Sequence, residues 1–233
     1  MLSPTTLEER LDYIQGRIHK AAVEAGRDPQ HITIVAITKA FPPEIWNLAL
    51  NVNLSTLGES RIRETQEKSG TFSQRKKINL HLIGHLQSNK VRKAIELFDV
   101  IQTVDSLQLA ERMERICGEI SKIQNIYLQV NTGADPKKYG IAAENAIFIA
   151  REISKKENLT LKGIMTIPAH GLGQTELSLI YKKTRKLRDE IQSRINDNCQ
   201  NISMGMSSDY EVAIAEGATH IRIGTCLFGT RPQ

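Results

Sequence analysis

The sequence has few cysteines and few aromatic residues, and each shortage excludes a class of protein. Its 233 residues include only Cys117, Cys199 and Cys226, with no C-x-x-C spacing. An odd number of cysteines so spaced predicts neither a disulfide framework nor a zinc site, and it is typical of the cytoplasm. We expect Cys226 to be a small core residue. Aromatic residues make up only 5% of the chain, so few side chains are available to stack on nucleic-acid bases.

Long apolar runs and a large charge surplus are also missing. No window approaches the roughly 18 apolar residues that a membrane-spanning helix needs. Charged residues recur between Met1 and Ala25, which a signal peptide does not allow. The net charge is +5, from 31 lysines and arginines and 26 acidic residues, and the basic clusters are short. We therefore expect a cytoplasmic protein that binds no nucleic acid, no membrane and no metal.

Strand-like and helix-like segments alternate along the chain. Leucines, isoleucines and alanines from Leu7 to Ala25 recur at helical spacing, with Ser3 or Thr5 as the expected cap and Gly26 at the end. Apolar, β-branched runs of strand length follow at 32–38, 54–57, 79–83, 99–103, 125–130, 161–166, 201–204 and 220–223. Helix-like segments lie between them at 44–51, 61–69, 89–97, 107–120, 142–155, 174–195 and 209–216.

This alternation admits an open doubly wound sheet or a closed barrel. Several of the runs are nearly all apolar, as expected for parallel strands covered on both faces. Eight strands within roughly 200 residues favour the barrel. The sequence therefore predicts one α/β domain, residues 1–233, with the TIM-type (β/α)8 fold and an extra N-terminal helix.

Polar residues follow the last two strands. Ser207 and Ser208 come after the seventh strand, and Gly224 and Thr225 come after the eighth. Barrels often bind phosphate with these two loops. The alternative is that the serines and Asp209 only cap a helix. Two such loops beside a lysine at a strand end favour an anion site.

That lysine is Lys39, which directly follows the first strand. Closure of the barrel places the eighth strand beside the first, so Lys39 and Gly224 are expected to be neighbours. The residue either snorkels at the barrel mouth or offers an amine, partly shielded from water, that forms a Schiff base. An aldehyde that carries a phosphate ester satisfies both features, and pyridoxal 5'-phosphate is the common cofactor of that description.

Arg222 and His85 are expected near the same mouth. A guanidinium only donates hydrogen bonds, so Arg222 facing a pyridine nitrogen keeps that nitrogen unprotonated and weakens the electron sink. The competing interpretation makes Arg222 the partner of a barrel carboxylate such as Glu59. His85 either stacks or donates near the ring, or it has a structural role.

The chain resembles the pyridoxal phosphate homeostasis proteins, relatives of the alanine racemase barrel, from about Leu7 to Arg231. The resemblance rests on several strings, chiefly I-G-H-L-Q-S-N-K at 83–90 and S-M-G-M-S at 203–207, with V-A-I-T-K at 35–39 and R-I-G-T at 222–225. It implies that Lys39 carries the cofactor as a Schiff base and that Arg222 faces the pyridine nitrogen. Around them we expect Ser207, Gly224 and Thr225 at the phosphate, and Ser60, His85, Met165 and Met204 at the ring. Ser60 stands where the family usually has asparagine.

The resemblance implies a cofactor carrier that regulates intracellular vitamin B6 and amino- and keto-acid pools, with no established catalytic turnover. Its implied partners are pyridoxal phosphate and apoenzymes that receive it. We expect a monomer, because no long apolar stripe is evident.

A racemase-like enzyme is the second hypothesis. Racemases with this barrel use a tyrosine as a second base, and none of Tyr127, Tyr139, Tyr181 and Tyr210 lies in a segment resembling that tyrosine's. A barrel acting on a phosphorylated metabolite is a third hypothesis, and a role in protein interaction is a further one.

Overall fold

Eight parallel strands close into a barrel in the computed structural model, which describes residues 6–230. The hydrogen-bonded order is β4-β3-β2-β1-β9-β8-β7-β5, and a pairing of β4 with β5 completes the ring. The strands are β1 (Thr33–Ile37), β2 (Thr56–Glu59), β3 (Asn79–Leu82), β4 (Val100–Val104), β5 (Gln124–Asn131), β7 (Leu159–Met165), β8 (Asn201–Met206) and β9 (His220–Ile223). The prediction of a (β/α)8 barrel is confirmed.

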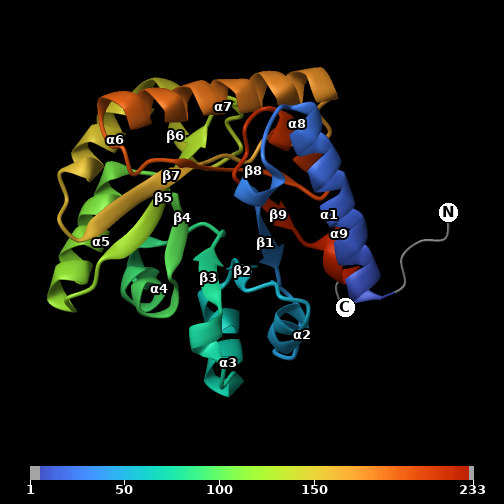
Figure 1. The fold of residues 1–233 in the computed structure, drawn as a ribbon. Coiled ribbons are helices and arrows are strands. Elements are labelled where there is room, and N and C mark those ends of the chain that lie inside the picture. The colour runs from blue at the N-terminus through green and yellow to red at the C-terminus, as the bar shows by residue number, and fades with distance from the viewer. Residues whose placement is uncertain (1–5, 231–233) are drawn as a thin grey trace.

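Helices surround the strands (Figure 1). Their bounds are α1 (Leu7–Glu24), α2 (Ile45–Asn51), α3 (Ile62–Thr71), α4 (Val91–Leu97), α5 (Leu107–Glu119), α6 (Ala146–Ser154), α7 (Gln174–Arg194), α8 (Tyr210–Ala215) and α9 (Thr225–Phe228). Short 3-10 turns occupy Pro29–His31, Arg75–Lys77, Ser88–Lys90 and Ala143–Asn145. One α-helix and one strand were not predicted: the short helix α9, and β6 (Ile141–Ala142), which pairs with β5. Within residues 6–230, no helix is long and apolar enough to cross a bilayer.

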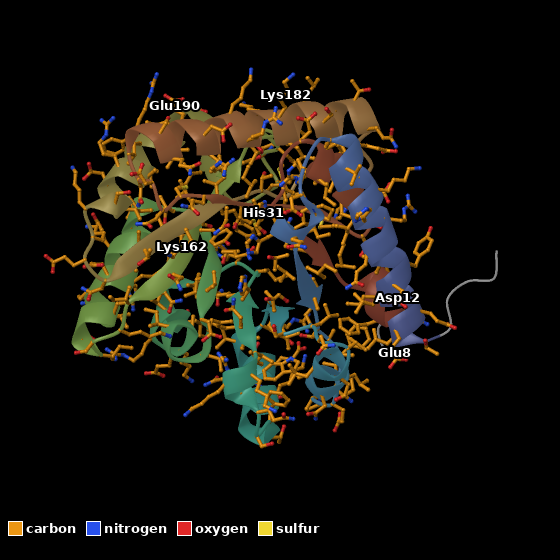
Figure 2. All side chains as sticks on the ribbon, in the orientation of Figure 1. Glu8, Asp12, His31, Lys162, Lys182 and Glu190 are labelled. Atoms are coloured by element: carbon orange, nitrogen blue, oxygen red, sulfur yellow. The ribbon has the colours of Figure 1, made fainter. Side chains whose placement is uncertain are left out.

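The additional N-terminal helix α1 packs beside α8 and α9 (Figure 1). Its cap is Thr6, which forms a capping box with Glu9. The prediction of Ser3 or Thr5 as the cap is therefore wrong, and both residues lie outside the described range. An apolar stripe of α1 is buried, whereas Glu8 and Asp12 are exposed, as Lys182 is on α7 (Figure 2).

Alternation along the strands creates two cores. Outward-facing residues such as Ala36, Ile164 and Ile223 join the main hydrophobic cluster between strands and helices. The barrel interior holds a much smaller apolar cluster of Val100, Tyr127 and Met165, with Ile167 beside it. Much of the remaining interior is polar, and this polar interior lies beneath the strand ends where the candidate site is built.

Candidate functional site

Lys39 follows the end of β1, beside the end of β9. Val35 pairs with Arg222 and Ala36 with Ile223. The next residues along the chain, Ile37 and Gly224, therefore lie side by side. A Cβ added at Gly224 would lie only 3.2 Å from Ile37 Cβ. The predicted neighbourhood of the strand-end lysine and the glycine loop is thus present in the strand register. Lys39 is half-buried there.

The backbone on both sides of Lys39 is held by an ion pair between buried Lys68 and partly buried Glu64. Lys68 Nζ donates to the Thr38 carbonyl at 2.8 Å and to Glu64 Oε1 at 2.8 Å. The same Glu64 oxygen accepts from the Ala40 amide at 2.5 Å. Ala40 adopts φ +62°, a left-handed conformation that is uncommon for a residue with a Cβ. Lys68 and Glu64 therefore fix the chain direction immediately before and after Lys39.

Glu59 is the third member of this cluster, and its contacts exclude one interpretation of Arg222. Its Oε1 accepts from Lys68 Nζ at 2.8 Å, from Thr38 Oγ1 at 2.7 Å and from Trp46 Nε1 at 3.2 Å. Burial raises the pKa of Glu59, against the opposing effect of the Lys68 ammonium. Burial also acts to raise the pKa of Glu64, but its bonds from Lys68 and Ala40 lower it overall. The interpretation of Glu59 as the partner of Arg222 is wrong, because Lys68 takes that place.

Arg222 is instead bound to hydroxyl and carbonyl oxygens inside the barrel. It is only 4% exposed. One terminal nitrogen donates to Ser203 Oγ at 2.8 Å and the other to the Thr166 carbonyl at 2.9 Å. Burial lowers the pKa of Arg222, while Tyr181 and Asp209 oppose that effect. The guanidinium remains a donor, fixed one step below the strand ends.

A directed hydrogen-bond chain runs from Arg222 across the barrel. The Ser203 hydroxyl accepts from Arg222 and donates to Gln102 Oε1 at 2.6 Å. Gln102 Nε2 lies 2.7 Å from His81 Nδ1. Because the Gln102 oxygen is engaged by Ser203, its nitrogen donates and His81 Nδ1 must accept. His81 is therefore held as the neutral ring, and burial, together with the nearby His220, lowers its pKa to about 3.

The loops after β8 and β9 meet, as predicted for an anion site. Ser207 Oγ accepts from the Gly224 amide at 3.4 Å. Ser207 and Thr225 both line a cavity of about 540 Å³ between these loops and α1. Asp209 occupies the cap position of α8, but its side chain accepts from the Met206 amide at 2.6 Å and makes no cap hydrogen bond to the helix. Helix capping by the aspartate therefore does not account for this loop.

Ser60 and His85 lie together on the opposite flank of β1, after β2 and β3. A Cβ at Gly84 would come within 2.3 Å of the Ser60 carbonyl oxygen, so the two loops touch. His85 Nδ1 lies 3.2 Å from Asp105 Oδ2, and its ring stacks on Tyr139 with centroids 4.0 Å apart. Burial raises the pKa of Asp105, against the opposing effect of His85.

Two side chains, Met204 and Cys226, do not lie where the sequence predicts them. Met165 belongs to the small cluster inside the barrel, but Met204 packs in the main cluster with Ile202 and Ile223. Met204 therefore faces the helices, and the prediction of Met204 as a neighbour of the ring is wrong. Cys226 is exposed, so the prediction of a core residue is wrong. Sequence reasoning missed Lys68 and the interior chain, although the i, i+4 spacing of Glu64 and Lys68 was visible.

Comparison with known proteins adds four similarities. The alanine racemase N-terminal domain matches residues 13–232. A pyridoxal phosphate homeostasis protein of Aquifex aeolicus is 35% identical over 225 residues, covering 96% of this chain and 97% of that protein. Among solved structures, an unknown protein from Bifidobacterium adolescentis has a TM-score of 0.91 at 33% identity, over 95% and 94% of the two chains. PipY of Synechococcus elongatus PCC7942, solved with PLP bound, has a TM-score of 0.86 at 33% identity, over 96% and 100%.

Proposed function

This chain belongs to the family of pyridoxal phosphate homeostasis proteins and carries the alanine racemase N-terminal domain, and from that premise we propose that it is a pyridoxal 5'-phosphate carrier. In this proposal Lys39 holds the cofactor covalently, and the protein releases it to apoenzymes that need it. The observation that carries the proposal is the position of Lys39 between a hydroxyl-lined loop pair and an ion pair that fixes its backbone.

The covalent step needs only the residues at the end of β1. With the cofactor bound, the Lys39 amine would take the place of its aldehyde oxygen in a C=N bond, with loss of one water. Hydrolysis of that bond would release the cofactor again, as a carrier requires. Lys68 and Glu64 hold the Thr38 carbonyl and the Ala40 amide, so the amine is presented without a search through backbone conformations.

The phosphate group fits the loops after β8 and β9. Ser207 and Thr225 offer hydroxyl donors from neighbouring loops that meet at the Gly224 amide. A side chain at Gly224 would press on Ile37, whose Cβ would lie 3.2 Å from the added Cβ, and glycine also lets the backbone of this loop approach a ligand closely. Ser60, His85 and Met165 are the residues we propose around the ring.

Arg222 favours storage over catalysis. The cofactor, when bound, supplies an electron sink whose strength depends on the protonation of its pyridine nitrogen. We propose that Arg222 faces this nitrogen. A guanidinium fixed by Ser203 and the Thr166 carbonyl donates a hydrogen bond without giving up its proton. The nitrogen then stays neutral and the sink stays weak.

Titration of the purified protein with pyridoxal phosphate, followed by absorbance, tests the proposal. The wild-type protein should develop a band near the visible edge, and a Lys39→Ala variant should not. Lys138→Ala is the matched control and should keep the band. Lys39→Arg, which preserves the charge, guards against loss of the fold. A band of unchanged intensity in both Lys39 variants would refute the role of this lysine.

A further inference from the structure

A strongly basic cavity lies on the β2 and β3 side of the barrel mouth. Its volume is about 370 Å³, and its lining comes from the loop after β2, the start of α3, the loop after β3, and α4. Arg61, Arg63, Lys90 and Lys93 contribute four positive charges. None of the described residues that line it is an aspartate or glutamate.

Few of these cations have a close acidic partner, although Arg61 is near enough to Glu64 to help lower the pKa of that carboxyl. Arg63 pairs with Glu67 at 3.1 Å, but Arg61, Lys90 and Lys93 form no ion pair with any residue in 6–230. Like charges gathered in one hollow repel one another. All four side chains are exposed, so water and salt weaken this repulsion, and an anion in the hollow would relieve it further.

Two further features point to an anion in the hollow. Helix α3 begins at the cavity, and Arg61 at its cap position makes no side-chain hydrogen bond to the helix. The first amides of α3 are thus left without a side-chain cap, and a helix N-terminus favours negative charge. Gln87 and Gln66 add amide groups to the lining.

The cavity is separate from the loops at Ser207 and Thr225. In the strand order, β8 and β9 flank β1 on one side, and β2 and β3 flank it on the other. Lys39 therefore lies between the hydroxyl-lined loops and the basic cavity. The string of residues 83–90 supplies His85, Gln87 and Lys90 to this lining, and the cofactor carrier role leaves the latter two unexplained. His85 itself is engaged by Asp105.

We propose that this basic cavity is a second anion site, which binds the phosphate group of a small phosphorylated metabolite beside Lys39. Arginine supplies paired donors that match phosphate oxygens, and lysine adds point charges. The hollow is of the size that small ligands occupy, which favours a small molecule over a flat acidic protein surface. The site does not depend on the cofactor being held at Lys39.

Calorimetric titration with inorganic pyrophosphate at low salt tests this site. With pyridoxal phosphate already held at Lys39 and at the loops of Ser207 and Thr225, the wild-type protein should bind one equivalent of pyrophosphate, and added salt should weaken binding. The double variant Lys90→Gln/Lys93→Gln should bind about two- to thirtyfold more weakly, as expected for the loss of two exposed charge pairs. Lys76→Gln/Lys77→Gln removes the same charge from the turn before β3, at the other end of the barrel, and should bind as the wild type does.

Three results would overturn the proposal. They are absence of saturable binding, equal weakening in both double variants, and loss of binding in Ser207→Ala, which would assign the ion to the β8 and β9 loops. Arg61→Gln removes a charge from a different element and should reproduce the weakening. Circular dichroism verifies the fold of each variant. The Lys90→Gln/Lys93→Gln variant should still develop the absorbance band of pyridoxal phosphate bound at Lys39. This result distinguishes a failure of anion binding in the cavity from a failure of the carrier function.

Discussion

Acidification should destabilise the fold through His81, the terminal acceptor of the chain that starts at Arg222. Its Nδ1 receives a hydrogen bond from Gln102, and its Nε2 is buried with no hydrogen-bond partner among residues 6–230. The ring is 1% exposed, and burial, with the nearby His220, lowers its pKa from 6.5 to about 3. Protonation of His81 at Nδ1 would set its new N–H against the N–H of Gln102. It would also place a positive charge in a closed interior.

The size of the effect follows from the difference in pKa between folded and unfolded protein. The folded pKa is depressed, so the unfolded state binds the extra proton first. Stability is complete above pH 6.5 and falls as the pH drops below that value, until about pH 3. At pH 5 the loss from His81 is about 2 kcal/mol relative to pH 7. His220, whose pKa burial lowers to about 4, acts in the same direction, but it is only half-buried by surface area.

Urea unfolding at pH 7 and pH 5 measures this loss. Glu59 and Asp105 have pKa values raised by burial and act in the opposite direction, so the informative quantity is the difference between variants. His81→Gln should reduce the pH dependence by about 2 kcal/mol, whereas exposed His31→Gln should leave it as in the wild type. An identical pH dependence in the wild type and His81→Gln would refute the reasoning.

Three further predictions concern the site. Replacing Ser207 or Thr225 by alanine should weaken pyridoxal phosphate binding about tenfold to a hundredfold, since a hydrogen bond to a charged acceptor contributes about 1.5–3 kcal/mol. Equal losses of affinity for pyridoxal, which lacks the phosphate, would contradict this role. In deuterated buffer, L-alanine should lose no α-hydrogen beyond stoichiometry. In the proposed arrangement Arg222 would leave the electron sink weak and Lys39 would be a single base serving one face, and missing acid–base help costs about 10²–10⁴ in rate. Rapid appearance of D-alanine would identify a racemase. Glu64→Gln should weaken formation of the Lys39 band about tenfold through loss of one charge-assisted hydrogen bond, while an unchanged affinity in the folded variant would remove its positioning role.

The barrel was predictable because each of its strands has a local signal in the sequence. Runs such as residues 32–38 are apolar and β-branched, and the helices between them have apolar stripes. The missed strand and α-helix are short: β6 has two residues and α9 has four, so neither develops a period. Cys226 was misplaced for the same reason, because α9 lies at the surface and no local pattern marks its exposed face.

The positions of candidate residues were predictable where strand ends alone define them. Those of Lys39, Ser207 and Gly224 follow from the order of strands and the closure of the barrel, and their roles toward a cofactor stay predictions. Lys68 lies in a polar stretch that resembles a solvated helix, and its burial depends on Glu59, a partner from another element. The location of the Met204 side chain depends on which way this residue of β8 faces. The ladder between β8 and β9 shifts register between Ser203 and Met206. Long-range pairs and register shifts leave no local trace in the sequence.

Borohydride reduction followed by peptide mapping tests the central claim most directly. The protein is saturated with pyridoxal phosphate and reduced, which fixes the C=N bond as a stable secondary amine. The digested peptides are then weighed by mass spectrometry. The account predicts a phosphopyridoxyl group on Lys39, at close to one per chain. Label at Lys90 or Lys138, with Lys39 unmodified, would contradict it.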